Sequence, residues 1–71
     1  MMDARKLIEM ALAYKGLSNS ELARALGWSP QSLNQRLNTG KFTMEEWGAI
    51  AAAMGAKVRV AFSFADGKVI E

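Results

Sequence analysis

The segment from residue 19 to residue 38 most constrains how this chain can fold. Its apolar residues recur at helical spacing in two short runs that are separated near Gly27. Glycine tolerates the positive φ at which a helix stops abruptly. Ser29 is a preferred N-cap, and Pro30 then falls at the first helical position, where its missing N–H does no harm. The segment therefore predicts two short helices joined by a tight turn.

The spacing of residues in this segment matches a known motif. The matching positions are Leu22, Ala23, Leu26, Gly27, Trp28, Ser29 and Leu33. With these residues the chain resembles the helix-turn-helix of the Cro/cI-type (XRE) phage-repressor family, over roughly residues 4–56. The resemblance implies a DNA-binding transcriptional repressor in which the second helix of the motif, residues 29–38, reads the major groove.

Arg36 departs from the family pattern, because many members carry an apolar residue at this position. Leu37 is apolar instead, and with Leu33 and Pro30 it is expected to form the apolar side of the helix. Arg36 is then expected at the edge of that side, with its stem against the protein and its guanidinium in solvent.

The size and composition of the chain limit its architecture and chemistry. With 71 residues we expect one mostly α domain over residues 1–71, with four helices within 3–56 and a β-hairpin at 57–71. The absence of cysteine and histidine removes most zinc sites and Ser-His or Cys-His catalysis. We expect no enzyme activity, cofactor, metal or small-molecule ligand. The sequence shows no membrane-spanning or signal pattern, and we expect a cytoplasmic protein.

The first helix is expected over residues 3–15, with Asp3 at its N-terminus and Gly16 at its end. Its charged side chains, Arg5 among them, are expected to lie in solvent. The expected apolar stripe consists of Leu7, Ala11 and Tyr14, widened by Ile8 and Leu12.

Two capping boxes mark the starts of further helices. The patterns S-x-x-E from Ser18 and T-x-x-E from Thr43 each allow a hydroxyl and a carboxylate to satisfy free backbone N–H groups. The helix that starts near Thr43 is expected to end at Gly55. Phe42 is expected to pack on Trp47 as a hydrophobic staple.

The C-terminal residues change to a period of two. Residues 57–64 alternate, and Asp66-Gly67 is a strong hairpin-turn signal. The expected apolar face consists of Val58, Val60, Phe62 and Phe64. An isolated hairpin is marginal in water, so this face is expected to lie on the helices. The free strand edge predicts a C2 homodimer through the hairpin, and the alternative is a monomer whose hairpin only completes the core.

The helix at residues 29–38 has an outer face that is polar but uncharged. This face carries Gln31, Ser32, Asn34, Gln35 and Asn38. An amide offers a donor and an acceptor together, which matches the adenine edge in the major groove. We expect Gln31, Ser32 and Gln35 to read bases, with Asn34 close by. The alternative is a polar face without a binding role.

Phosphate contacts are expected on both sides of this helix. The loop at residues 39–41 follows it, and its backbone amides, Lys41 and Asn38 are placed to hold a phosphate. Ser18 and Asn19, at the start of the preceding helix, are the other expected contacts. The residues predicted to contact DNA are Ser18, Asn19, Ser29, Gln31, Ser32, Asn34, Gln35, Arg36, Asn38 and Lys41.

The distribution of charge supports a phosphate-facing surface. The net charge is only +2, but no acidic residue lies between Leu22 and Met44, where Arg24, Arg36 and Lys41 are basic. The alternative is chance in a short chain. We therefore expect a sequence-specific regulator that binds double-stranded DNA, and the modest charge keeps a second hypothesis open, a protein-interaction module on the same scaffold.

Overall fold

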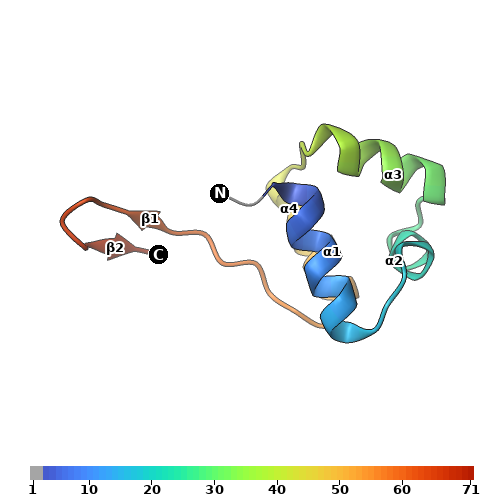
Figure 1. Ribbon diagram of the computed structural model, residues 1–71, viewed down its shortest axis with the longest axis horizontal. Helices are drawn as coiled ribbons and strands as arrows, with labels where there is room; N and C mark the ends of the chain where they lie inside the picture. The colour runs from blue at the N-terminus through green and yellow to red at the C-terminus, as the bar shows by residue number, and fades with distance from the viewer. Residues whose placement is uncertain (1–2) are drawn as a thin grey trace.

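A computed structural model describes residues 3–71 of the protein and contains four helices and a small hairpin (Figure 1). The elements are α1 (Ala4–Lys15), α2 (Asn19–Leu26), α3 (Pro30–Thr39), α4 (Met44–Ala53), β1 (Phe62–Ser63) and β2 (Val69–Ile70). The predicted fold class, a mostly α helix-turn-helix with a C-terminal hairpin, is confirmed. Within residues 3–71 no helix has the length and apolar character needed to cross a membrane.

The helices begin at the capping residues that the sequence indicates. The Oδ1 of Asp3 accepts from the backbone N–H of Lys6, and the capping boxes that start at Ser18 and Thr43 are both formed. Between α2 and α3 the chain turns at Gly27, whose φ of +75° is a conformation that residues with a Cβ rarely adopt. This tight turn fixes α3 directly after α2.

The core lies between the four helices, and each contributes to it. The buried cluster consists of Ile8, Leu12, Leu22, Ala23, Leu33, Leu37, Ile50 and Met54. Ala23 is completely buried, and its small side chain lets α2 and α3 approach closely. Because Leu33 and Leu37 both lie in this cluster, the opposite side of α3 must face outward.

The apolar stripe of α1 differs from the expected one. Ile8 and Leu12 are buried, whereas Leu7 is 51% exposed and Tyr14 is 89% exposed. Two overlapping stripes at helical spacing run along α1, and the sequence does not say which one faces α3. Pro30 is also exposed, because the first position of α3 lies in the turn beyond the core.

The hairpin does not pack on the helices, and the expectation that it would do so was wrong. The Asp66-Gly67 turn forms as predicted, but each strand has only two residues, paired as Phe62 with Ile70 and Ser63 with Val69. Residues 57–61 have no strand partner. Figure 1 shows residues 57–71, here called the arm, extending away from the helices.

Candidate nucleic-acid interface

The outward face of α3 presents two free amide side chains. Successive residues in a helix are separated by about 100°, so Gln31 and Gln35 lie opposite the buried Leu33 and Leu37. Both glutamines are exposed, and neither has a hydrogen-bond partner within residues 3–71. Their amides are therefore available to a ligand along one line of the helix.

The hydroxyl residues of the predicted site serve mainly as caps. Ser29 Oγ accepts from the backbone N–H of Ser32 at 3.1 Å, and Ser18 Oγ accepts from that of Glu21 at 3.1 Å. In return, Glu21 Oε1 accepts from the backbone N–H of Ser18, which brings a carboxylate to the start of α2. Asn19, the next residue, is exposed. The N-terminus of α2 is therefore a less favourable site for an anion than the sequence suggested.

Arg36 lies on one flank of α3 and points toward the protein. Its guanidinium pairs with Glu46 of α4 and lies over two aromatic rings, 4.8 Å from the ring centre of Trp28 and 5.7 Å from that of Phe42. Its Nε is buried and has no hydrogen-bond partner among residues 3–71. The expectation that this guanidinium points into solvent was wrong, because two rings and a carboxylate form a favourable site for it beside the core.

The carboxylate partner of Arg36 is itself held in its charged form. The backbone N–H of Thr43 donates to Glu46 and, with the neighbouring Arg36 charge, lowers the pKa of this carboxyl below its ordinary value. Phe42 also packs on Trp47, with ring centres 5.1 Å apart, as the predicted staple requires. This cluster joins α3 to the start of α4.

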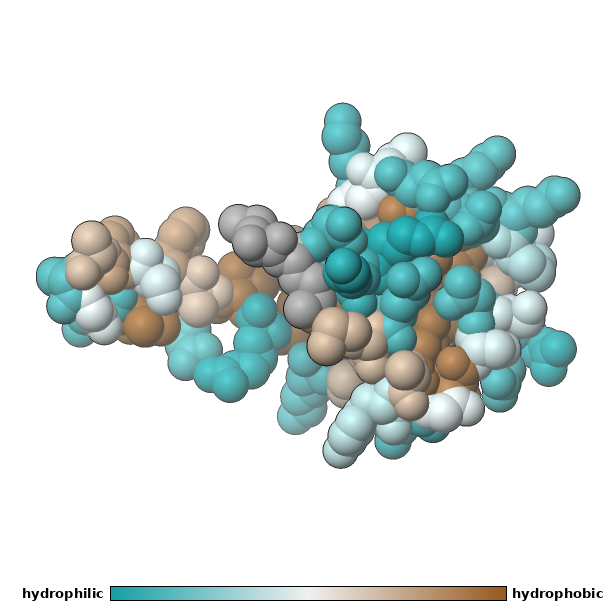
Figure 2. Space-filling model, in the orientation of Figure 1, coloured by the Kyte–Doolittle hydropathy of each residue, from teal (hydrophilic) through white to brown (hydrophobic). Residues whose placement is uncertain are grey.

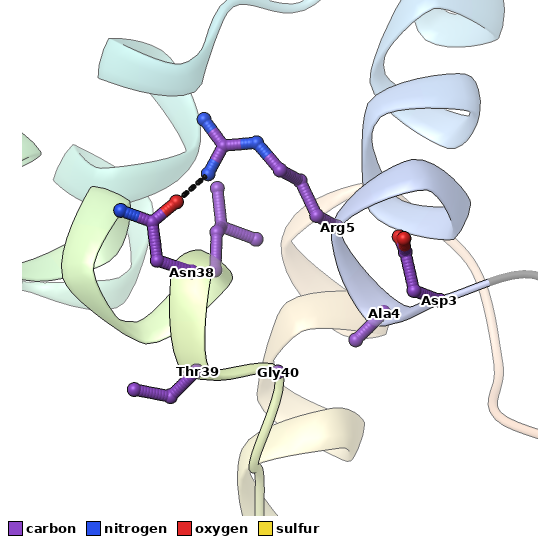
Figure 3. Close-up of a pocket in the computed structure, with 7 residues that line it drawn as sticks. Asp3, Ala4, Arg5, Asn38, Thr39 and Gly40 are labelled. Carbon is purple, nitrogen blue, oxygen red and sulfur yellow. Dashed lines mark hydrogen bonds between the residues drawn. The ribbon is translucent and has the colours of Figure 1, made fainter.

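Arg5 lies on the other flank of α3, and the expectation that it would be free in solvent was wrong. Its Nη1 donates to Asn38 Oδ1 at 2.6 Å (Figure 3), and its Nη2 donates to Asn34 Oδ1 at 3.0 Å. Its Nε lies 3.2 Å from Glu9 Oε2. The guanidinium therefore connects the first turn of α1 to two residues one helical turn apart on α3.

Arg5 is the residue that the sequence did not reveal. Its position relative to α3 depends on how α1 crosses that helix, and no local pattern states this crossing. The only signal was a pair of asparagines at i, i+4, Asn34 and Asn38, which share one edge of α3.

A shallow hollow of about 200 Å³ lies beside the contact between Arg5 and Asn38 (Figure 3). It is lined by Asp3, Ala4, Arg5, Leu37, Asn38, Thr39 and Gly40. The backbone N–H of Gly40 donates to the Arg36 carbonyl, so this loop amide is used to end α3. Lys41 is exposed and has no ion pair within the described residues 3–71.

Residues 4–39 match a family described as winged helix-turn-helix DNA-binding. The matched range covers just over half of the chain and includes α1, α2 and α3. The protein belongs to the winged helix-turn-helix DNA-binding family. No curated protein and no solved structure matches the chain.

The residues matched by the family include the helix-turn-helix motif that the sequence indicated. Arg5, α2 and the whole of α3 lie within the matched residues, whereas Glu46 and the arm lie outside them. In Figure 2 hydrophilic side chains gather over the part of the molecule that contains α3, whereas the arm carries hydrophobic and hydrophilic side chains together. The family-matched helices and the arm are thus separate parts of the molecule.

Proposed function

We propose that this winged helix-turn-helix protein is a sequence-specific transcriptional regulator, a repressor of the Cro/cI (XRE) phage-repressor type that its motif resembles. The observation that carries the proposal is the exposed amide pair, Gln31 and Gln35, on the side of α3 opposite the core. Solvated helix faces usually carry charged pairs, whereas amides suit base edges. We propose that the protein is not an enzyme.

In this proposal α3 enters the major groove, and its residues divide by role. Gln31 and Gln35 each offer an oxygen and a nitrogen, the combination that pairs with N6 and N7 of adenine. Ser32, half-buried beside them, reaches a base through its hydroxyl. Lys41 and Asn19 hold phosphates on either side of α3. Arg36 contributes by fixing the position of the helix, since Glu46 already offsets its charge.

We further propose that the protein works as a C2 homodimer through the arm. The chain exposes 5469 Å², whereas a compact globule of 7.7 kDa exposes about 4,300 Å². Its radius of gyration is 13.4 Å, against about 11 Å for a compact chain of this length. The excess area exceeds the roughly 800 Å² that each partner buries in a stable interface.

The arm has the features of a surface that another copy covers. Its strands leave unpaired backbone groups at their edges, which can extend the sheet into a second hairpin. Phe62 is 70% exposed and Val60 is 56% exposed. A dimer of this kind would place two α3 helices on half-sites about 34 Å apart, one turn of the duplex.

The test is binding of labelled duplex DNA, first a randomised pool and then selected sequences, measured by fluorescence anisotropy at about 50 and 200 mM salt. Binding is expected to weaken steeply with salt and to enrich a palindromic sequence. Gln31→Ala is expected to weaken the selected site by roughly 5-fold to 100-fold, the discrimination of one bidentate amide pair. Tyr14→Ala, which removes an exposed side chain in the last turn of α1, is the control.

Two results would overturn the proposal. One is the absence of binding at the lower salt by protein whose circular dichroism shows it to be folded. The other is binding that Gln31→Ala leaves unchanged. Either result would favour a protein-interaction module on the same scaffold, whose activity should depend on apolar residues of the arm instead.

A further inference from the structure

Arg5 determines which way two amides of α3 are turned. A guanidinium has only donors, so any amide that it contacts must present its oxygen to it. The contacts to Asn34 and Asn38 therefore fix both amide oxygens toward α1, at 3.0 Å and 2.6 Å. This assignment follows from the chemistry of the partner and does not depend on distinguishing oxygen from nitrogen by position.

The guanidinium itself is held in place from a third side. Its Nε lies 3.2 Å from Glu9 Oε2, and Glu9 is one turn from Arg5 on α1. Three separate contacts thus fix one planar group, although its side chain remains about one-third exposed. A group fixed in this way orders the two asparagines before any ligand binds.

The consequence is a difference between the two amide pairs of α3. An amide that pairs with adenine must aim both its oxygen and its nitrogen at the base edge. Gln31 and Gln35 keep both atoms free within residues 3–71. The amide oxygens of Asn34 and Asn38 accept hydrogen bonds from Arg5, and so these amides present N–H donors to a ligand.

We infer that Arg5 is a specificity-determining residue, because by holding the Asn34 and Asn38 oxygens it makes this edge of α3 select acceptor atoms of the duplex. In the major groove these acceptors are O6 and N7 of guanine, N7 of adenine and O4 of thymine, and on the backbone they are phosphate oxygens. Asn34, nearer the N-terminus of α3, is the base reader of the two, and guanine, with two adjacent acceptors, is its preferred base. This inference rests on the proposed DNA-binding function.

The experiment compares duplex selection by the unmodified protein, Arg5→Met and Lys6→Met. Methionine keeps an unbranched side chain with good helix propensity. Lys6 is the exposed neighbour of Arg5, and its side chain makes no hydrogen bond or ion pair within residues 3–71, so Lys6→Met removes the same charge without touching the asparagines. Asn34→Ala identifies the base position that Asn34 reads.

At that position the unmodified protein and Lys6→Met are expected to prefer guanine over adenine. In Arg5→Met the Asn34 amide is free to rotate, and the preference for guanine is expected to fall by roughly threefold to tenfold, the value of about one hydrogen bond. Arg5→Lys keeps the charge but offers one nitrogen in place of two, so its preference is expected to fall as well. This second variant keeps the test decisive if Arg5→Met does not fold.

The outcomes separate the inference from the function on which it rests. If the unmodified protein binds no DNA, the proposed function fails. If it selects a sequence and Arg5→Met weakens all duplexes equally with a smaller salt dependence, Arg5 is a phosphate contact and the inference is overturned. Unchanged base preference and unchanged affinity in both Arg5 variants would overturn it too, with the proposed function intact.

Discussion

The helices and the arm use apolar residues of the same kinds with opposite results. In the helical body, formed by α1 to α4, Leu33 is completely buried and lies among apolar residues from all four helices. In the arm Phe62 is 70% exposed and Ile70 is 53% exposed, because two paired residues per strand give them almost nothing to pack against. Within residues 3–71 the helices and the turns between them cover one another's apolar side chains, whereas nothing covers those of the hairpin.

The largest effect is expected from a truncation in the core between the helices. Leu33→Ala creates a cavity in the core and is expected to lower the free energy of unfolding by about 2–5 kcal/mol. That is a large part of the roughly 4–10 kcal/mol expected for a domain of this size. Urea denaturation measures it. A loss below about 1 kcal/mol would mean that α3 is not held by this core.

Removing the Arg36 side chain tests whether it stabilises the fold of the helices or contacts DNA. Arg36→Ala loses the contacts with the Trp28 and Phe42 rings and is expected to destabilise by about 1–2 kcal/mol in urea denaturation. The salt dependence of DNA binding should be nearly unchanged, since the charge faces Glu46. Full stability together with a reduced salt dependence would restore Arg36 to its first predicted role as a phosphate contact.

Acid should lower the stability of the folded helices by protonating Glu46. Because the folded state lowers the pKa of Glu46 below its ordinary value of 4.5, its stabilising effect is complete above that value and is lost as the pH falls through the folded pKa. Glu46→Gln is expected to remove part of the acid-induced fall in stability. Glu45→Gln, at the exposed neighbouring position, is the control and should follow the unmodified protein. Identical acid profiles for all three proteins would contradict this role.

The smallest effect on folding is expected in the arm. Phe62→Ser should change the free energy of unfolding of the helical body by less than about 0.5 kcal/mol, because the ring is mostly exposed. Sedimentation equilibrium of the same variant should show weaker dimerisation. A large loss of helix stability would indicate that the arm packs on the body in solution, and an unchanged dimer would place the interface elsewhere.

The sequence predicted the parts of this structure that local chemistry controls. The caps at Asp3, Ser18 and Thr43 and the turn at Gly27 lie where their side-chain and backbone preferences require, and so the helices begin and end close to the predicted residues. The outward direction of Gln31 follows from the same periodicity.

The features that the sequence did not predict depend on contacts between distant segments. The asparagines that accept hydrogen bonds from Arg5 come from α3. The rings and the carboxylate around Arg36 come from the loops before and after α3 and from α4. The choice between the stripes that contain Tyr14 and Ile8 depends on which side of α1 meets the core. The hairpin turn was predictable from Asp66-Gly67, but the position of the arm was not.

Whether α3 reads the DNA is tested by observing the side-chain amide signals of Gln31 and Gln35 by ¹⁵N–¹H nuclear magnetic resonance while a selected duplex is added. We predict that both signals shift at stoichiometric DNA in low salt, whereas signals from the hairpin turn at Gly67 do not. Glutamine signals that stay unchanged while the duplex binds would show that α3 is not the surface that reads the DNA.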